Sequence, residues 1–240
     1  MTAAGPAGAR IVGQDFFLRL AYAIAGATVF AFAFNAAGGH VDIPRVPWWV
    51  HVHAAAMMAW FGIYVAQNRL TRASDKAMHR ALGWSSVALV VANAPLSWFS
   101  GIMAISMHRT PAFYTPPYFL ALALVETAAF TALVLAAVGA RRDIEAHRRL
   151  VAGASLVVSE PALVRLLPMA ALGGEPGETI ILVIQFCVVA VIALHDRRAL
   201  GKIHPATFAV GGAVATIHLL IALGSRSTPI IAFAERLAGA

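Results

Sequence analysis

Seven long apolar segments run through this chain of 240 residues, and they constrain its fold more than any other feature. A helix needs about 20 apolar residues to cross a hydrocarbon layer of about 30 Å, and only helices and closed barrels satisfy their backbone there. The segments are continuous rather than alternating, which argues against a barrel. We therefore predict an all-α, polytopic integral membrane protein, a bundle of seven transmembrane helices. The predicted helices are 16–37, 48–68, 81–104, 117–140, 150–171, 178–195 and 206–224.

The composition supports the same conclusion. Hydrophobic residues make up 60% of the chain and charged residues 12%, and the mean hydropathy is +0.76. A water-facing surface cannot be built from such a composition, so the lipid bilayer is the expected partner. Residues 1–15 are small and polar, and we predict a mobile N-terminal tail before a single transmembrane domain, 16–240.

The basic residues of the loops predict the orientation. Thirteen of the lysines and arginines fall on one side of the seven predicted spans and four on the other. Because basic residues concentrate in cytoplasmic loops, the N-terminus is predicted inside and the C-terminus outside. We expect a multi-pass protein of the inner (cytoplasmic) membrane of a bacterium. The net charge of +7 is spread over short loops, so no nucleic acid is expected as a partner.

Three predicted cytoplasmic turns resemble one another. His79, His147 and His204 each follow a basic loop and stand at the start of a predicted helix. The spacing indicates a three-hairpin repeat after the first helix. An interfacial or capping role is one interpretation of these histidines, and binding of a lipid phosphate or a quinone head is the other.

Polar residues recur at one depth in the outer half of the predicted bundle. Asn93, Glu160 and His218 lie thirteen or fourteen residues beyond the three repeat histidines, and the outgoing helices add His53, Glu126 and Gln185, with Arg165 at a similar depth. An ionisable group inside a span costs about 2.5–3.5 kcal/mol at the membrane centre, so such groups usually face the bundle interior and mark a site. We therefore predict one functional site in the outer half.

The helical period indicates which of these side chains face inward. His53 shares a stripe with Trp60 and Tyr64, whereas His51 is rotated away and is expected near the membrane interface. We interpret Arg165 and Glu126 as an ion pair between neighbouring helices. Recognition of an anionic group by Arg165 and proton transfer through Glu126 or Glu160 are the functional alternatives.

The leading functional hypothesis is membrane electron transfer with haem b or quinone as cofactor. His53 and His218 are predicted at matching depths on two helices, the arrangement that holds haem iron in membrane bundles. In broad outline this is similar to membrane cytochromes of the b561 type, although the chain has neither their full histidine set nor a repeated pattern for a second haem. The hypothesis also involves Arg165 at a haem propionate, Tyr64 as a proton partner for quinone, and Asn93 in the cofactor-binding layer.

Two other classes of function stay open. Proline-interrupted helices and an outer-half polar layer also suit a small-solute or proton-linked transporter or sensor. A non-catalytic membrane subunit would use the same polar groups only to lock helices together. The loop 108–118 is predicted to cap the bundle or to act as a lid. The chain shows no catalytic motif that would identify an enzyme, and its only cysteine, Cys187, excludes an intrachain disulfide.

Overall fold

The structure is a computed structural model, and it describes residues 13–239 apart from the side chains of Ala170 and Glu175. Within these residues the chain is helical and contains no strand. The elements are α1 (Gln14–Ala37), η1 (Ile43–Arg45), α2 (Trp48–Arg72), α3 (Lys76–Ser106), α4 (Pro116–Gly139), α5 (Ile144–Val157), α6 (Glu160–Val164), α7 (Met169–Leu172), α8 (Gly174–Leu200), α9 (Pro205–Gly224) and α10 (Thr228–Ala238).

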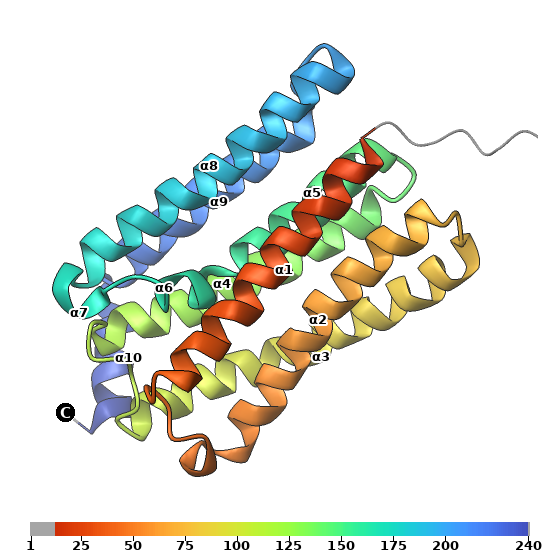
Figure 1. Cartoon of the computed structure of the whole chain (residues 1–240). Helices are drawn as coiled ribbons and strands as arrows, with labels where there is room; N and C mark the ends of the chain where they lie inside the picture. The colour runs from red at the N-terminus through yellow and green to blue at the C-terminus, as the bar shows by residue number, and fades with distance from the viewer. Residues whose placement is uncertain (1–12, 240) are drawn as a thin grey trace, which may run out of the picture.

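Six helices of the described chain are long and apolar enough to cross a membrane: α1, α2, α3, α4, α8 and α9. This supports the prediction of a multi-pass membrane protein. The helices run lengthwise beside one another, with α2 and α3 along one side of the bundle, α8 and α9 along the other, and α1, α4 and α5 between them (Figure 1). The helix pairs α2–α3, α4–α5 and α8–α9 each pack together, as expected for hairpins.

The two ends of the bundle differ. The short helices α6, α7 and α10 gather at one end, and the α2–α3, α4–α5 and α8–α9 turns lie at the other (Figure 1). We call these the outer end and the cytoplasmic end, after the orientation that the loop charges predict.

The prediction of one continuous helix over 150–171 is wrong. The chain forms α5 up to Val157, turns at Val158 and Ser159, and starts again as α6 at Glu160. Pro161 is the physical reason, because proline has no N–H for a helical bond to Val157 and its ring collides with that carbonyl. The fifth predicted span is therefore a broken segment, and it is not one of the six long apolar helices.

A close approach fixes α5 against α9. A Cβ atom added at Gly153 would lie 2.6 Å from Val210 Cγ2, so only glycine permits this contact between the two helices. Small residues at such a crossing let backbones pack closely where no hydrophobic effect drives helices together.

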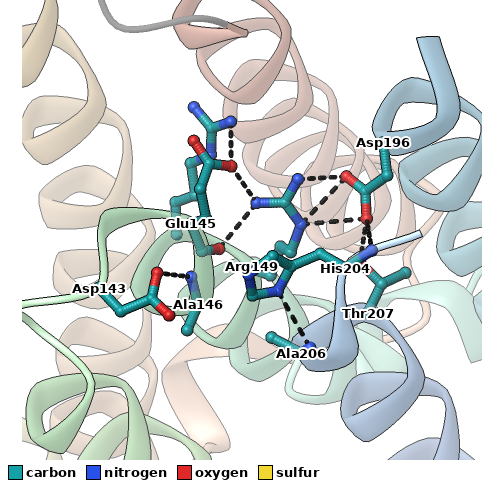
Figure 2. Close-up of polar contacts among 9 residues, drawn as sticks. Asp143, Glu145, Ala146, Arg149, Asp196, His204, Ala206 and Thr207 are labelled. Carbon is teal, nitrogen blue, oxygen red and sulfur yellow. Dashed lines mark hydrogen bonds and ion pairs between the residues drawn. The ribbon is translucent and has the colours of Figure 1, made fainter. Parts of the chain in front are cut away.

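A buried ion pair fixes the cytoplasmic end of the same helices. Arg149 of α5 is completely buried and donates from Nε to both carboxylate oxygens of Asp196 in α8, at 3.0 and 3.1 Å. Figure 2 shows that Asp196 Oδ2 also accepts bonds from the backbone N–H of His204 and the hydroxyl of Thr207. Because each charge is matched and hydrogen-bonded, the network joins α5, α8 and α9 without leaving an unpaired buried ion.

Candidate functional site

Three residues of the predicted outer-half layer meet near the outer end. His218 Nε2 of α9 lies 3.2 Å from Gln185 Oε1 of α8 and 3.6 Å from Glu160 Oε2 at the start of α6. Gln185 Nε2 is 3.4 Å from the same glutamate oxygen. The residues that the sequence places at one depth on three different segments are thus direct neighbours in the fold.

A fourth residue, Glu178, completes the cluster and is absent from the sequence prediction. The Glu178 carboxylate, the Glu160 carboxylate and the His218 ring each offer one ligand atom. These three atoms lie within 4.8 Å of one another. Both glutamates are buried, and Glu160 Oε1 and Glu178 Oε2 have no hydrogen-bond partner. We call Glu160, Glu178, His218 and Gln185 the outer cluster.

The break between α5 and α6 positions Glu160. Ser159 turns the chain and donates its hydroxyl to Leu156 O at 2.6 Å, and Glu160 then opens α6 with Pro161 behind it. A proline at the first turn of a helix loses no bond, so the chain restarts where its side chain can reach α8 and α9. The feature that interrupts the span therefore also places a carboxylate in the bundle.

The start of α8 positions Glu178. Gly173 joins α7 to α8 with a φ of 77°, a conformation that residues with a Cβ rarely adopt. The helix that follows carries Glu178 and Gln185 seven residues apart, and hence two turns apart on one face. This spacing was available in the sequence, but Glu178 stands at the end of a predicted span, where a carboxylate is ordinary.

Tyr114 from the loop before α4 covers the outer cluster. Its hydroxyl donates a hydrogen bond to Glu178 Oε1, and its ring stacks on Tyr118 with centroids 5.2 Å apart. Burial, together with the nearby charge of Glu178, raises the pKa of Tyr114 above its ordinary value. The phenol therefore stays protonated at physiological pH and remains a donor. The loop that is predicted to cap the bundle contacts the site through Tyr114.

Glu126 of α4 is a third buried carboxylate near this cluster. Glu126 interacts electrostatically with both Glu160 and Glu178, and its Oε1 has no hydrogen-bond partner. Three buried carboxylates that interact electrostatically repel one another when they are ionised. The outer cluster therefore combines two carboxylates with one imidazole and one amide.

The ion pair predicted between Glu126 and Arg165 is wrong. Arg165 is exposed, lies 4.4 Å over the ring of Phe32, and donates to the carbonyl of Pro161. The prediction assumed an unbroken helix, and the turn at Val158 and Ser159 changes the direction in which Arg165 projects.

His53 belongs to a different cluster, between α2 and α3. Its Nδ1 lies 3.2 Å from both Asn93 Oδ1 and Ser97 Oγ, and Asn93 Nδ2 is 3.1 Å from the sulfur of Met57. Tyr64 of the same face is buried and its hydroxyl is unpartnered, and His51 is exposed, as the helical period predicts. Thus His53 and His218, which the sequence pairs by depth, have separate sets of polar neighbours.

Comparison with protein-family models, curated proteins and solved structures gave no match to this chain. The function is therefore argued from the chemistry of the outer cluster.

Proposed function

We propose that this multi-pass membrane protein is a proton-linked carrier of divalent metal cations, which it binds at the outer cluster. The observation that carries the proposal is the convergence of ligand atoms from Glu160, Glu178 and His218 within 4.8 Å. Glu160 and Glu178 each also have one buried carboxylate oxygen without a hydrogen-bond partner. Two carboxylates and one imidazole are a common ligand set for zinc and for other first-row divalent ions.

Charge supports a cation as the bound species. Burying carboxylates without a counter-charge costs several kcal/mol for each ion, so the cluster must be neutralised by protons or by a cation. Divalent cation binding at deprotonated ligands releases protons, which links occupancy to pH. Carboxylate and histidine groups inside transmembrane bundles typically serve ion or proton pathways.

The proposal is tested by equilibrium binding of Zn²⁺ and Mn²⁺ to the detergent-purified protein. We expect a tight site at the outer cluster, weakened at least tenfold by Glu160→Gln, Glu178→Gln or His218→Gln. Glu235→Gln is the matched control, because Glu235 is an exposed carboxylate on α10. Unchanged binding in all three site variants would refute the proposal.

Transport is tested separately in proteoliposomes that contain a metal-sensitive dye and a pH-sensitive dye. We expect metal entry to be accompanied by proton movement in the opposite direction, and both signals to disappear in Glu178→Gln. Metal binding without metal entry or proton movement would indicate a metal sensor rather than a carrier. Variants that alter stability but no binding would instead favour a non-catalytic membrane subunit.

The remaining functional expectations stand as predictions. Haem b or quinone binding at His53 and His218, an electron-transfer partner, and a bacterial inner-membrane location are each compatible with a multi-pass helical protein. The separate polar neighbours of the two histidines favour the cation site over this redox arrangement.

A further inference from the structure

Two other histidines come together at the cytoplasmic end. His79 in the first turn of α3 and His147 in the first turn of α5 have ring centroids 6.4 Å apart, with their planes at 70°. Each helix is capped in the same way, since Asp75 accepts from Met78 N and Asp143 from Ala146 N, both at 3.0 Å. The same spacing from aspartate to histidine therefore presents one imidazole from each of two neighbouring hairpins.

The hydrogen bonds of His147 define its tautomer. Its Nδ1 lies 2.7 Å from the carbonyl oxygen of Ala137 at the end of α4. A carbonyl only accepts, so Nδ1 carries the hydrogen and the lone pair of the neutral ring is on Nε2.

The hydrogen bonds of His79 lead to the same tautomer. Thr71 donates its hydroxyl hydrogen to Gln67 O at 2.9 Å, so it cannot also donate to the ring. His79 Nδ1, which is 3.3 Å from Thr71 Oγ1 and 3.4 Å from Gln67 O, must therefore be the donor. Nε2 again holds the lone pair.

When it is neutral, each of these imidazoles offers an Nε2 lone pair to a metal. Histidines that bind metals usually donate the other ring N–H to a carbonyl or a similar acceptor, which fixes the tautomer and orients the ring. Metal–imidazole bonds are about 2 Å long, so two rings on opposite sides of one metal have centres about 6 Å apart. The centroid separation of 6.4 Å between His79 and His147 is close to this value.

We infer that His79 and His147 coordinate one metal centre through their Nε2 atoms, either a haem iron or a bare transition-metal ion. The described part of the chain brings no third His, Cys, Asp or Glu into a ligand group with them. The other coordination positions must then be filled by a porphyrin or by solvent. Gln67 adjoins the pair, donating from Nε2 to His79 O at 3.0 Å, and its buried Oε1 is an unpartnered acceptor available to a bound group.

This site is independent of the outer cluster, and the experiment keeps the two apart. The full-length Glu160→Gln/Glu178→Gln double variant is purified from cells supplied with a haem precursor and with copper and zinc. Haem is quantified from the oxidised and dithionite-reduced absorption spectra and from a pyridine haemochrome assay, and metals are quantified by mass spectrometry. We expect one metal centre per chain, with the haem assay separating haem iron from a bare ion.

The ligand assignment is tested in the same background. His79→Gln and His147→Gln should each lose at least nine-tenths of the bound centre, while His51→Gln, a change at an exposed histidine, should retain it. If the centre is haem, His147→Met should keep it and raise its midpoint potential, because methionine–histidine ligation does so. If it is a bare ion, external imidazole should restore binding to His147→Gly.

These readouts separate ligation from folding, because neither a raised potential nor rescue by imidazole follows from a purely structural role. A background protein without haem or bound metal would overturn the inference. Full metal content in both His79→Gln and His147→Gln would overturn it as well.

Discussion

At the residue scale, the outer cluster depends on side chains that meet from segments far apart in the sequence. Periodicity and depth predict Glu160, Gln185 and His218 as one layer, and the fold brings them within hydrogen-bonding or ion-pairing distance. Depth alone does not determine which helices are neighbours. The sequence therefore pairs His53 with His218, although the hydrogen-bond partners of His53 are Asn93 and Ser97.

Tyr114 provides the sharpest test at this scale. Replacement of Tyr114 by Phe removes the donor to Glu178 Oε1 while leaving the stacked ring in place. A hydrogen bond to a charged group contributes about 1.5–3 kcal/mol, so we expect loss of the donor that holds Glu178 to weaken Zn²⁺ binding by about tenfold or more. Titration of Tyr114→Phe beside Tyr22→Phe, an exposed tyrosine of α1, measures this effect. Equal affinity in the two variants would show that Tyr114 only covers the site.

At the element scale, the long helices were predictable and the interruption was not. Six of the seven predicted spans coincide with long apolar helices, because continuous apolar runs of this length have few other solutions. Pro95 and Pro161 were both visible in the sequence, yet α3 continues through Pro95 and the chain breaks at Pro161. The outcome depends on the polar partners that each freed backbone group finds, which a single sequence does not reveal.

The break itself is testable with Pro161→Ala. Alanine restores a backbone donor and favours a continuous helix through 158–160, which would rotate Glu160 away from α8 and α9. We expect Zn²⁺ affinity to fall at least tenfold while the protein stays folded. Pro95→Ala is the control, since Pro95 lies inside an unbroken helix and is exposed. Retention of full affinity in Pro161→Ala would contradict the role assigned to the break.

The ion pair between Arg149 and Asp196 is an element-scale feature as well, because it joins α5 to α8. Arg149→Met leaves Asp196 as a buried charge without its counter-ion, which costs about 3–5 kcal/mol in comparable buried pairs. We expect a clear drop in the midpoint of thermal unfolding in detergent. Arg197 directly follows Asp196 in α8 and is exposed, so Arg197→Met should leave the midpoint nearly unchanged. Similar midpoints for the two variants would show that the pair does not stabilise the fold.

At the scale of the whole molecule, orientation rests on the loop charges. The α3–α4 loop is predicted outside and the α4–α5 turn inside, since the former holds only Arg109 and the latter has Arg141 and Arg142. With Cys187 replaced by Ala, single cysteines at Arg109 and Arg141 can be labelled in sealed cells. We expect an impermeant maleimide to modify the first position and not the second until the membrane is opened. The reverse pattern would invert the orientation.

The broken α5–α6 segment decides the number of crossings, and labelling extends to it. A cysteine in place of exposed Arg236 on α10 should also be labelled from outside, if the segment carries the chain across the bilayer as the sequence predicts. If only this cysteine were not labelled from outside, the C-terminal helix would lie on the same side as the N-terminus, and the number of membrane crossings would be even.

The central claim is that one divalent cation binds between Glu160, Glu178 and His218. The most direct test is an anomalous difference map, collected at the zinc absorption edge, from crystals of the zinc-loaded protein. We predict a strong peak at the outer cluster, with zinc–ligand distances of about 2.0–2.2 Å to both carboxylates and to the imidazole. A fully loaded crystal with its zinc peak elsewhere, and none between these three residues, would contradict the account.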